Sequence, residues 1–494
     1  MKLAEILNGI ELCDGTPKGA SDIEITSVCV DSRRLEPGCL FIALRGTRSD
    51  GHDYIARAAQ GGAAFVLCEV LLEKEINVPY AITTDTQAAL ALAAANFYGK
   101  PAEKMKIIGV TGTNGKTTVT HLVKRMLEDL TGKPAGIIGT IGDMLGDEPL
   151  GIDREALTTP QPIELHRLFA EMLKKGCEYV VMEVSSHALE QKRVAGITFT
   201  VGVFTNLTRD HLDFHGSMEE YARVKALLFA QSRSGIVNAD DNAAAELILQ
   251  AKCDISTYSA KSDAGDLVAR QIKLLPGKVE FCALMIGEIE RTELGIPGLF
   301  SVYNALAAML TLKLLGFELP AAASALARCA GVPGRAEAVP TGRDFTVLID
   351  YAHTPDALEN IIKAVREGAE GRVVTLFGCG GDRDKTKRPI MGEIAARLSD
   401  YVVVTSDNPR TEPPDEIINA ILSGMADTKT PYAVIESRRE AIAWAVRSLS
   451  QGDTLILAGK GHELYQQIGN EKFDFDERKI VAEAIAAAEG GGAQ

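Results

Sequence analysis

Short apolar runs recur along the chain and alternate with longer segments of helical periodicity. From about residue 102 onward the runs include KIIGV, AGIIG, YVVME, TVGVF and GIVNA, which are rich in β-branched residues. Runs of this kind, separated by helices, are typical of strands that are buried on both faces. The pattern therefore predicts a mostly parallel sheet covered by helices on both sides.

Two breaks in this pattern predict domain boundaries. Gly99 and Pro101 end an Ala-rich helical segment, and the stretch AGVPGR interrupts the helical pattern again before residue 336. Further strand-like runs precede the first break (SVCVDS, CLFIAL, AAFVLC) and follow the second (FTVLID, RVVTLF, DYVVVT, DTLILA). We therefore expect three α/β domains, at residues 1–100, 101–334 and 335–494.

Composition narrows the class of protein. The 494 residues are 46% hydrophobic and carry a formal net charge of −15, which argues against binding to nucleic acid or to an anionic membrane. The nine cysteines are scattered and never form a C-x-x-C pair, so neither a disulfide framework nor a zinc site is indicated. No apolar run approaches the length of a membrane span. We expect a cytoplasmic protein without a transmembrane segment.

A glycine-rich stretch follows the first strand of the central domain. The sequence GVTGTNGKTT leads from KIIGV into a helical segment, and such a turn offers backbone N–H groups at the positive end of a helix dipole. Lys116 and Thr117 stand where P-loops place a phosphate-binding lysine and a Mg²⁺-binding hydroxyl. Val110 occupies the position of the first P-loop glycine, and Gly109 lies one residue early. This predicts a variant ATP site; the alternative is a turn with a helix cap.

Polar residues also end other predicted strands, where ligands of parallel sheets bind. Glu183 closes the run VVME, where Mg²⁺ would compensate a poorly solvated carboxylate. The segment FTNLTRDHLDFHG places His211 just beyond another strand. In the predicted helix 217–230, Lys225 has apolar neighbours, and desolvation would lower its pKa and make a neutral amine available. Each residue alone also fits an ordinary paired or snorkelling side chain.

Taken together, the motifs resemble those of the Mur ligase family. GVTGTNGKTT, EVSSHAL, NLTRDHLDFHG, YARVKALLF, GVPGRAE, DYAHTPDAL and GKGHE occur in the family's order, and the resemblance covers nearly the whole chain. It implies a small α/β domain that binds UDP, a central, mostly parallel sheet of the P-loop ATPase type, and a Rossmann-like C-terminal domain. SVCVDSRRLEPG and SDNPRTEPP resemble the members that add the third amino acid to UDP-N-acetylmuramoyl-L-alanyl-D-glutamate through an acyl phosphate.

The resemblance assigns an ATP site, two Mg²⁺ ions and a group of catalytic residues. The implied metal ligands are Thr117, Glu183, His211 and a CO₂-derived carbamate on Lys225; Mn²⁺ is an alternative metal because histidine is an unusual ligand for Mg²⁺. The implied catalytic residues are Lys116, Glu183, His211 and Lys225. The implied ATP-binding residues are Gly112, Thr113, Asn114, Gly115, Lys116, Thr117, Thr118, Asn304, Arg335 and Asp350, with His353 nearby.

The resemblance also assigns the two other substrate sites. The UDP-muramoyl-dipeptide would contact Val30, Ser32, Thr47, Arg48, Ser49, Thr158, Thr159, Ser185, Gln191 and Arg193, although DSRR without the surrounding motifs is better explained as an exposed turn. The amino acid would contact Arg383, Asp407, Asn408, Pro409, Arg410, Gly459 and Glu463. Arg410 favours meso-diaminopimelate over lysine, because a guanidinium can bind the extra carboxylate with two parallel hydrogen bonds.

Several alternatives remain at this stage. They are a lysine-adding member of the family, a ligase similar to folylpolyglutamate synthase, and a P-loop switch or motor. The glycine loop GCGGD lacks the spacing G-x-G-x-x-G and does not indicate an NAD site. The expected partners are small-molecule substrates only, and the expected state is a monomer.

Overall fold

The computed structural model describes residues 1–13, 15, 17, 19–46, 49–71, 76–152, 154–155, 157–208 and 212–490. The chain forms two compact units. The first comprises Met1–Tyr258 and Leu310–Gly316, and the second comprises Ser259–Met309 and Phe317–Gln494. None of the helices within the described residues is both long and apolar enough to cross a membrane.

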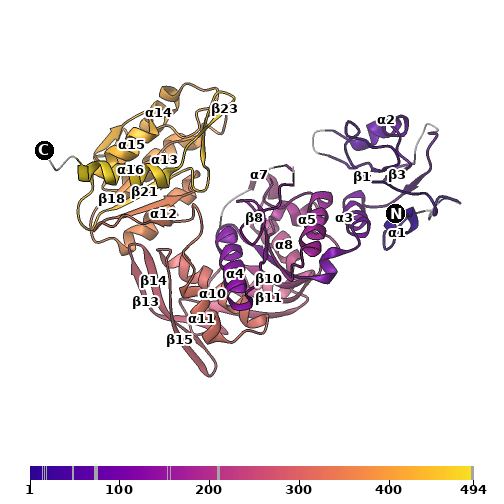
Figure 1. Ribbon diagram of the computed structural model, residues 1–494, viewed down its shortest axis with the longest axis horizontal. Coiled ribbons are helices and arrows are strands. Elements are labelled where there is room, and N and C mark those ends of the chain that lie inside the picture. The colour runs from indigo at the N-terminus through magenta and orange to yellow at the C-terminus, as the bar shows by residue number, and fades with distance from the viewer. Residues whose placement is uncertain are drawn as a thin grey trace. The chain divides into compact units, whose positions relative to one another are not determined.

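The first unit begins with a four-stranded parallel sheet, in the order β1-β2-β3-β4. Helix α3 packs Leu90 and Ala93 against this sheet, and Asp85 caps its N-terminus by accepting a hydrogen bond from the Ala88 N–H. Figure 1 shows this part in indigo. Its elements are α1 (Leu3–Ile6), β1 (Val28–Cys29), β2 (Leu40–Ile42), η1 (Gly51–Tyr54), α2 (Ile55–Gln60), β3 (Phe65–Cys68), β4 (Tyr80–Ile82), α3 (Thr86–Phe97) and η2 (Pro101–Lys104).

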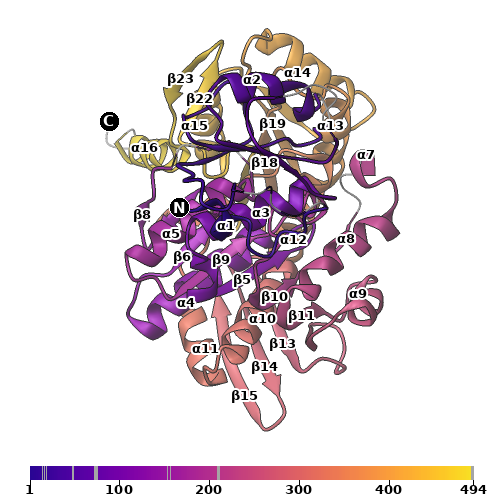
Figure 2. The same cartoon turned by 90° about the vertical axis from the view of Figure 1, so that its right-hand side faces the viewer.

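The rest of the first unit contains a larger sheet with the strand order β12-β11-β10-β5-β9-β6-β7-β8 (Figure 2). The strands from β12 to β6 run parallel, and β7 and β8 are antiparallel additions at the edge. The strands are β5 (Lys106–Thr111), β6 (Gly136–Ile138), β7 (Asp143–Leu145), β8 (Glu148–Pro149), β9 (Tyr179–Glu183), β10 (Phe199–Phe204), β11 (Ser232–Asn238) and β12 (Asp254–Ser259).

In the part of this unit that the structure describes, six helices, α4 to α9, accompany the sheet. Leu165 and Phe169 of α5 and Leu228 of α8 share one buried core with Val180 and Met182 of β9, so these two helices cover the same face. The Ser217 hydroxyl caps α8 by accepting a hydrogen bond from the Glu220 N–H. The helices are α4 (Lys116–Thr131), α5 (Pro162–Lys174), α6 (Ser186–Glu190), α7 (Leu212–His215), α8 (Met218–Ala230) and α9 (Ala244–Gln250).

The second unit starts with three antiparallel strands, β13 (Leu267–Leu275), β14 (Lys278–Met285) and β15 (Glu288–Leu294). They are followed by α10 (Leu299–Leu314), whose residues from Leu310 onward belong to the first unit, and by α11 (Leu319–Ala327). The parallel pattern predicted for the central domain did not include these strands. Their sequence signal is the alternation in KVEFCALM between the turns at Gly277 and Gly287, which is typical of hairpins.

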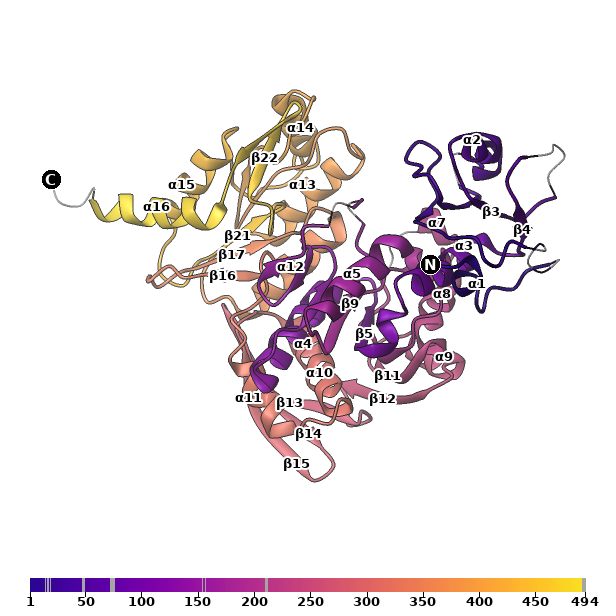
Figure 3. The same cartoon turned by 45° about the vertical axis from the view of Figure 1, so that its right-hand side comes forward.

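The remainder of the second unit is a six-stranded sheet with the order β16-β17-β21-β18-β19-β20, in which only β16 is antiparallel. Figure 3 shows β16, β17 and β21 side by side. Helices α15 and α16 cover one face through Ile442 and Val481. The elements are β16 (Glu337–Val339), β17 (Thr346–Asp350), α12 (Pro355–Gly368), β18 (Val373–Phe377), α13 (Lys387–Leu398), β19 (Tyr401–Val404), α14 (Pro414–Ser423), β20 (Tyr432–Val434), α15 (Arg438–Ser448), β21 (Thr454–Ala458), β22 (Tyr465–Ile468), β23 (Glu471–Asp474) and α16 (Glu477–Gly490).

The α/β class predicted from the alternation of runs is therefore confirmed, with strands at the apolar runs named above. The domain boundaries at residues 100 and 334 stay predictions. Because neighbouring parallel strands end at the same edge of a sheet, β5, β9 and β10 bring their carboxyl ends together, and so do β17, β21, β18 and β19.

Candidate active site

The turn between β5 and α4 has the backbone conformation that an anion cradle requires. Gly112 and Gly115 have φ angles of 143° and 85°, which favour glycine. A Cβ at Gly112 would lie 1.9 Å from the Thr205 Oγ1, so this position also needs the absence of a side chain. The Lys116 Nζ donates hydrogen bonds to the carbonyl oxygens of Gly112 and Thr113, both at 2.8 Å. The Lys116 ammonium therefore lies against the same loop that is predicted to bind the phosphates.

Gly109 does not replace the missing first glycine of the P-loop pattern. It lies inside β5, where a Cβ would approach the Phe199 ring to 2.7 Å and Leu228 to 3.1 Å. Its role is therefore close packing of α8 and β10 against the strand. The segment after β10 supports the loop instead, because the Asn206 Oδ1 accepts from the Asn114 N–H at 3.0 Å and the Thr205 hydroxyl donates to the Asn114 carbonyl at 2.6 Å.

Glu183 lies at the end of β9 and is 1% exposed. Its Oε1 accepts hydrogen bonds from the Thr117 hydroxyl at 3.1 Å and from the Thr140 N–H at 2.9 Å. Its Oε2 accepts from the Thr140 hydroxyl at 3.1 Å. The Glu183 carboxylate and the Thr117 hydroxyl are thus in contact and both buried. The donors in these three hydrogen bonds to the carboxylate are two hydroxyls and one backbone N–H.

The predicted dipeptide-binding residues of this unit gather around Glu183. The Thr159 hydroxyl donates to the Glu183 carbonyl at 2.9 Å and accepts from the Ser185 N–H at 3.0 Å. Arg193 donates from Nη1 to the Thr159 carbonyl and from Nε to the Gln191 Oε1, both at 3.0 Å. The structure therefore brings together residues from three separate segments that were grouped only by resemblance.

Thr158 lies beside a cavity of about 350 Å³ whose wall also includes Gly139, Thr140 and Arg154. The Thr158 and Thr140 hydroxyls are 3.2 Å apart. Arg154 holds this wall together: it forms a largely buried pair with Asp143 and donates from Nη1 to the Leu157 carbonyl at 2.6 Å. The cavity therefore lies beside the Thr140 hydroxyl, which donates a hydrogen bond to Glu183.

Lys225 lies on α8 and is 1% exposed. Its Nζ is 4.3 Å from the centre of the Tyr221 ring. The Tyr221 hydroxyl accepts a hydrogen bond from the Thr113 hydroxyl at 3.4 Å, and its ring stacks on His215 at 4.7 Å. One aromatic side chain thus connects Lys225 with the P-loop. His211 lies outside the described residues.

The N-terminal sheet carries part of the predicted uridine site. Ser32 is half-buried and Val30 is exposed, in the loop that follows β1. Arg33 pairs with Asp31 at 2.8 Å, and this contact lowers the pKa of the Asp31 carboxyl to about 2. The Ser49 carbonyl accepts a hydrogen bond from the Gly46 N–H at 3.1 Å. Thr47 and Arg48 lie outside the described residues.

The predicted amino-acid site occupies the carboxyl ends of β18, β19 and β21. The Asn408 Nδ2 donates to the Glu463 Oε2 at 2.9 Å, which joins the motifs DNPR and GKGHE. Gly459 has a φ of 118°, and a Cβ there would approach the Asp407 Oδ2 to 2.7 Å. Pro409 is buried beside the glycine loop, since a Cβ at Gly381 would lie 1.8 Å from its carbonyl oxygen.

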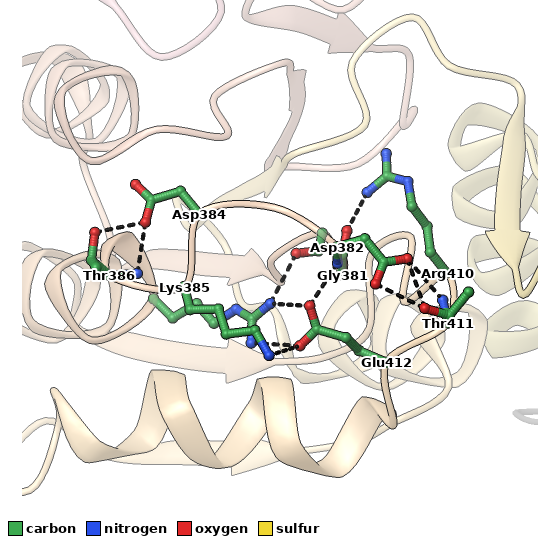
Figure 4. A network of polar contacts seen from close by, with 10 residues as sticks. Gly381, Asp382, Asp384, Lys385, Thr386, Arg410, Thr411 and Glu412 are labelled. Carbon is green, nitrogen blue, oxygen red and sulfur yellow. Dashed lines mark hydrogen bonds and ion pairs between the residues drawn. The ribbon is translucent and has the colours of Figure 1, made fainter. Parts of the chain in front are cut away.

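Arg410 is held in a left-handed conformation with a φ of 52°. Its Nη1 donates to the Gly381 carbonyl at 2.7 Å (Figure 4). Its backbone N–H donates to the Gln467 carbonyl at 3.2 Å. The Gly381 carbonyl, in the glycine loop after β18, therefore orients the Arg410 guanidinium. Arg383 is exposed on the same loop.

A network of charged groups ties this glycine loop to the segment after β19 (Figure 4). Glu412 accepts two hydrogen bonds from Arg388, both at 3.0 Å, and one from the Asp382 N–H at 2.6 Å. The Arg388 guanidinium lowers the pKa of the Glu412 carboxyl to about 2. The Asp382 carboxylate in turn accepts from the Thr411 hydroxyl at 2.8 Å. The two residues that follow Arg410 in the sequence, Thr411 and Glu412, therefore both belong to this network.

The other predicted ATP-binding residues, Asn304, Arg335 and Asp350, lie in the second unit. Asn304 is buried on α10. The Asp350 carboxylate accepts backbone N–H bonds from Ala336 at 2.7 Å and from Ala352 at 2.8 Å. The Arg335 guanidinium carbon lies 5.2 Å from the centre of the Tyr351 ring, a cation–π distance.

Sequence reasoning missed several residues that shape these sites. They are Thr140, Arg154, Arg388 and Glu412, and the last three follow no apolar run of the kind that drew attention to Glu183. The available signal was weak: Thr140 follows the predicted strand AGIIG, so it too lies at a strand end. The charged pairs carry no local signal, because Arg388 and Glu412 are 24 positions apart.

The oxygen donors on the first unit fit a hard divalent cation. Carboxylate and hydroxyl oxygens are suitable Mg²⁺ ligands, and Thr117 and Glu183 already place such oxygens 3.1 Å apart beside the phosphate loop. Within the described residues, no group of three or more His, Cys, Asp and Glu side chains could hold a metal ion. A magnesium ion here would therefore draw on hydroxyl, substrate or water oxygens as well.

Known proteins and family models match this chain over almost its entire length. Family models match residues 24–111 (Mur ligase family, catalytic domain), 110–312 (Mur ligase middle domain) and 334–461 (Mur ligase, glutamate ligase domain). A protein of Caldanaerobacter subterraneus subsp. tengcongensis, named UDP-N-acetylmuramoyl-L-alanyl-D-glutamate–2,6-diaminopimelate ligase, is 45% identical over 490 residues, covering 99% of this chain and 100% of the relative. A relative with the same name followed by the numeral 1, from Clostridium acetobutylicum, is 43% identical over 98% of this chain and 99% of its own.

A solved structure agrees with these sequence matches. The structure described as UDP-N-acetylmuramoyl-L-alanyl-D-glutamate–2,6-diaminopimelate ligase aligns with a TM-score of 0.74 and 30% identity, and covers 99% of both chains. Matches of this extent include the phosphate loop, the Glu183 cluster and the DNPR and GKGHE segments together. The chain therefore belongs to the Mur ligase family.

Proposed function

We propose that the protein is an ATP-dependent ligase that joins meso-diaminopimelate to the D-glutamyl carboxylate of UDP-N-acetylmuramoyl-L-alanyl-D-glutamate, a step of peptidoglycan precursor synthesis. The observation that carries this proposal is the cluster around Glu183, where the P-loop hydroxyl of Thr117 and the Thr158–Thr159 segment meet. Relatives at 45% and 43% identity carry the name of this activity.

The phosphates of ATP fit the turn between β5 and α4. The N–H groups of residues 112–118 and the Lys116 ammonium would bind the phosphate oxygens, as helix N-termini bind anions. Arg335 is proposed to contact a phosphate as well, Asn304 the adenine and Asp350 the ribose. Thr117, Glu183 and His211 would hold magnesium, which would neutralise phosphate charge and polarise the transferred phosphoryl group.

Amide formation requires activation of the substrate acid, because a carboxylate resists attack by an amine. A D-glutamyl carboxylate oxygen attacks the γ-phosphorus, the bond to the β-phosphate oxygen breaks, and ADP leaves. Lys116 would offset the repulsion between the two anions and stabilise the transferred charge. The neutral amine of diaminopimelate then attacks the acyl carbon, loses a proton, and expels phosphate as the amide forms.

Lys225 is the proposed site of carbamylation. The reaction joins the neutral amine to CO₂ with release of one proton, and it converts a cation into an oxygen ligand for the second magnesium ion. Lys225 is 1% exposed, and it lies beside Tyr221, whose hydroxyl contacts the P-loop residue Thr113; this position supports the proposal.

Arg410 is the proposed determinant of the amino acid. Diaminopimelate differs from lysine by one carboxylate, and the Gly381 carbonyl orients the guanidinium that would bind it. Asp407 and Glu463 supply carboxylates for the ammonium groups, and Arg383, Asn408, Pro409 and Gly459 complete the proposed contacts.

Uridine diphosphate is proposed to bind the N-terminal sheet through Val30, Ser32, Thr47, Arg48 and Ser49. Thr158, Thr159, Ser185, Gln191 and Arg193 would contact the muramoyl-peptide part. We propose that the protein acts in the cytoplasm as a monomer on small molecules, without nucleic acid.

Phosphate release distinguishes this function from its alternatives. The purified protein would receive ATP, Mg²⁺ and the UDP-muramoyl-dipeptide, with meso-diaminopimelate or L-lysine offered separately. We expect phosphate release only when the dipeptide and diaminopimelate are both present. Release with lysine would support the lysine-adding alternative, and release without either substrate would indicate a switch or motor.

A further inference from the structure

Lys460 is a buried cation of the GKGHE segment that the proposed function leaves without a role. Its side chain is 0% exposed, and it lies between Gly459 and Gly461, directly after β21. Burial lowers the pKa of the Lys460 amine. An amine in such a place is costly unless its hydrogen bonds are satisfied, so its contacts identify what it stabilises.

Among the described residues, three oxygen atoms lie within 3.5 Å of the Lys460 Nζ. It donates hydrogen bonds to the Asn408 Oδ1 at 2.9 Å and to the Tyr465 carbonyl at 2.7 Å. The Asp407 Oδ1 lies 3.4 Å away, at ion-pair distance. The lysine thus contacts the first two residues of the DNPR segment and the start of β22.

These contacts set the orientation of the Asn408 amide. Its Oδ1 accepts from Lys460 and, at 2.8 Å, from the Gln467 N–H, so the oxygen faces inward. The Nδ2 must then point the opposite way, where it donates to the Glu463 Oε2 at 2.9 Å. Glu463 itself lies 3.8 Å from the Lys460 Nζ. One ammonium therefore aligns an amide and two carboxylates at the end of the sheet.

We propose that Lys460 is a positioning residue for amino-acid recognition, which orients Asn408 and balances Asp407 and Glu463 so that these groups are set for the ammonium and carboxylate groups of the incoming diamino acid. This inference rests on the proposed function, because it assigns Lys460 a role in binding the amino acid of that reaction. Lys460 reaches the amino acid only through Asn408 and the two carboxylates.

The test replaces Lys460 by methionine, which has a similar length but no charge. Lys460→Met should raise KM for the amino acid about tenfold or more, since a charged hydrogen bond in a buried site is lost. KM for ATP and for the UDP-muramoyl-dipeptide should change by less than about twofold, because the contacts of Lys460 are confined to the amino-acid segments. A purely structural role would shift all three constants or none.

A double-mutant cycle with Asn408→Ala tests the route of the effect. If Lys460 acts through Asn408, adding Lys460→Met to Asn408→Ala should raise KM for the amino acid by less than about twofold more. Full additivity of the two effects would overturn the proposed route. Lys124→Met is the matched control, because Lys124 is 2% exposed and pairs with Glu128 at 2.8 Å in the other unit. It should lower thermal stability without a selective change in KM for the amino acid.

Lys460→Gln serves as the second variant, since its amide can still donate to the Tyr465 carbonyl. Circular dichroism would establish folding before the kinetics. Failure of both variants to fold, or an unchanged KM for the amino acid, would overturn the inference while leaving wild-type activity as support for the proposed function. A wild-type protein that uses neither diaminopimelate nor lysine would instead refute the proposed function itself.

Discussion

The Glu183 cluster and the amino-acid segments after β18, β19 and β21 are built in different ways. Around Glu183 the partners are hydroxyl and backbone N–H groups, such as the Thr117 hydroxyl and the Thr140 N–H. Around Arg410 the partners include full charges, such as Arg388 with Glu412 and Lys460 with Asp407. The first arrangement suits ligands shared by a whole family, whereas the second suits discrimination between related substrates.

This contrast predicts that changes at the phosphate loop affect every substrate. Lys116→Ala should lower kcat at least about 100-fold with either amino acid, because a cation that stabilises transferred phosphate charge is lost. Phosphate release under saturating substrates measures the effect. Lys133→Ala, at an exposed lysine that pairs with Glu178, should retain wild-type kcat. A Lys116→Ala enzyme with more than about a tenth of wild-type kcat would contradict the assignment.

Changes at the DNPR segment should instead affect one substrate. Arg410→Ala should lower kcat/KM for diaminopimelate about 10- to 100-fold relative to lysine, because only diaminopimelate has the second carboxylate. The measurement is the ratio of kcat/KM values for the two amino acids. Arg439→Ala, at an exposed arginine that pairs with Glu483, is the control and should leave the ratio unchanged. An intact preference in Arg410→Ala would remove Arg410 as the determinant.

A smaller effect is expected at a residue that only supports Glu183. Thr140→Val removes the hydroxyl that donates to the Glu183 Oε2 but leaves the backbone N–H in place, so kcat should fall about tenfold. A titration of activity against Mg²⁺ should show a raised requirement. Thr375→Val, at a buried hydroxyl paired with Ser399 at 2.7 Å, is the control; it should affect stability more than kcat. Equal Mg²⁺ requirements in wild type and Thr140→Val would argue against this supporting role.

The smallest effect concerns stability rather than turnover. Arg388 lowers the pKa of Glu412 from an ordinary 4.5 to about 2 in the folded protein, so ionised Glu412 stabilises the fold above pH 4.5 and progressively less as the pH falls toward 2. Glu412→Gln should therefore be less stable than wild type at pH 7, and the difference should narrow below pH 4.5. Urea unfolding of both proteins at several pH values measures this. A difference that is independent of pH would contradict the ion pair.

The two regions also differ in how far the sequence predicts them. Glu183 and Thr117 could be proposed as site residues from local sequence alone. Glu183 ends a strand-like run, and Thr117 belongs to a glycine-rich motif whose residues are close along the chain. Arg410 could be assigned through the motif DNPR. The orientation of Arg410 could not, since it depends on Gly381, which is 29 positions away and comes close only because β18 and β19 are neighbours.

Strand order accounts for most of what sequence reasoning missed. Lys460 contacts Asn408 across 52 positions, and this requires the end of β21 and the segment after β19 to converge at one sheet edge. No local pattern encodes that order. The antiparallel strands β13 to β15 were not predicted for a different reason. Their alternating pattern lies in a predicted domain whose other apolar runs are continuous and indicate parallel strands.

The central claim is that ATP activates the substrate carboxylate, and oxygen transfer tests it most directly. The D-glutamyl carboxylate of the UDP-muramoyl-dipeptide would be labelled with ¹⁸O, and the phosphate released with ATP and diaminopimelate would be analysed by mass spectrometry. The account predicts that one carboxylate oxygen appears in each phosphate, because that oxygen bridges carbon and phosphorus before the amine attacks. Unlabelled phosphate would show that water attacks ATP instead, and it would contradict the account.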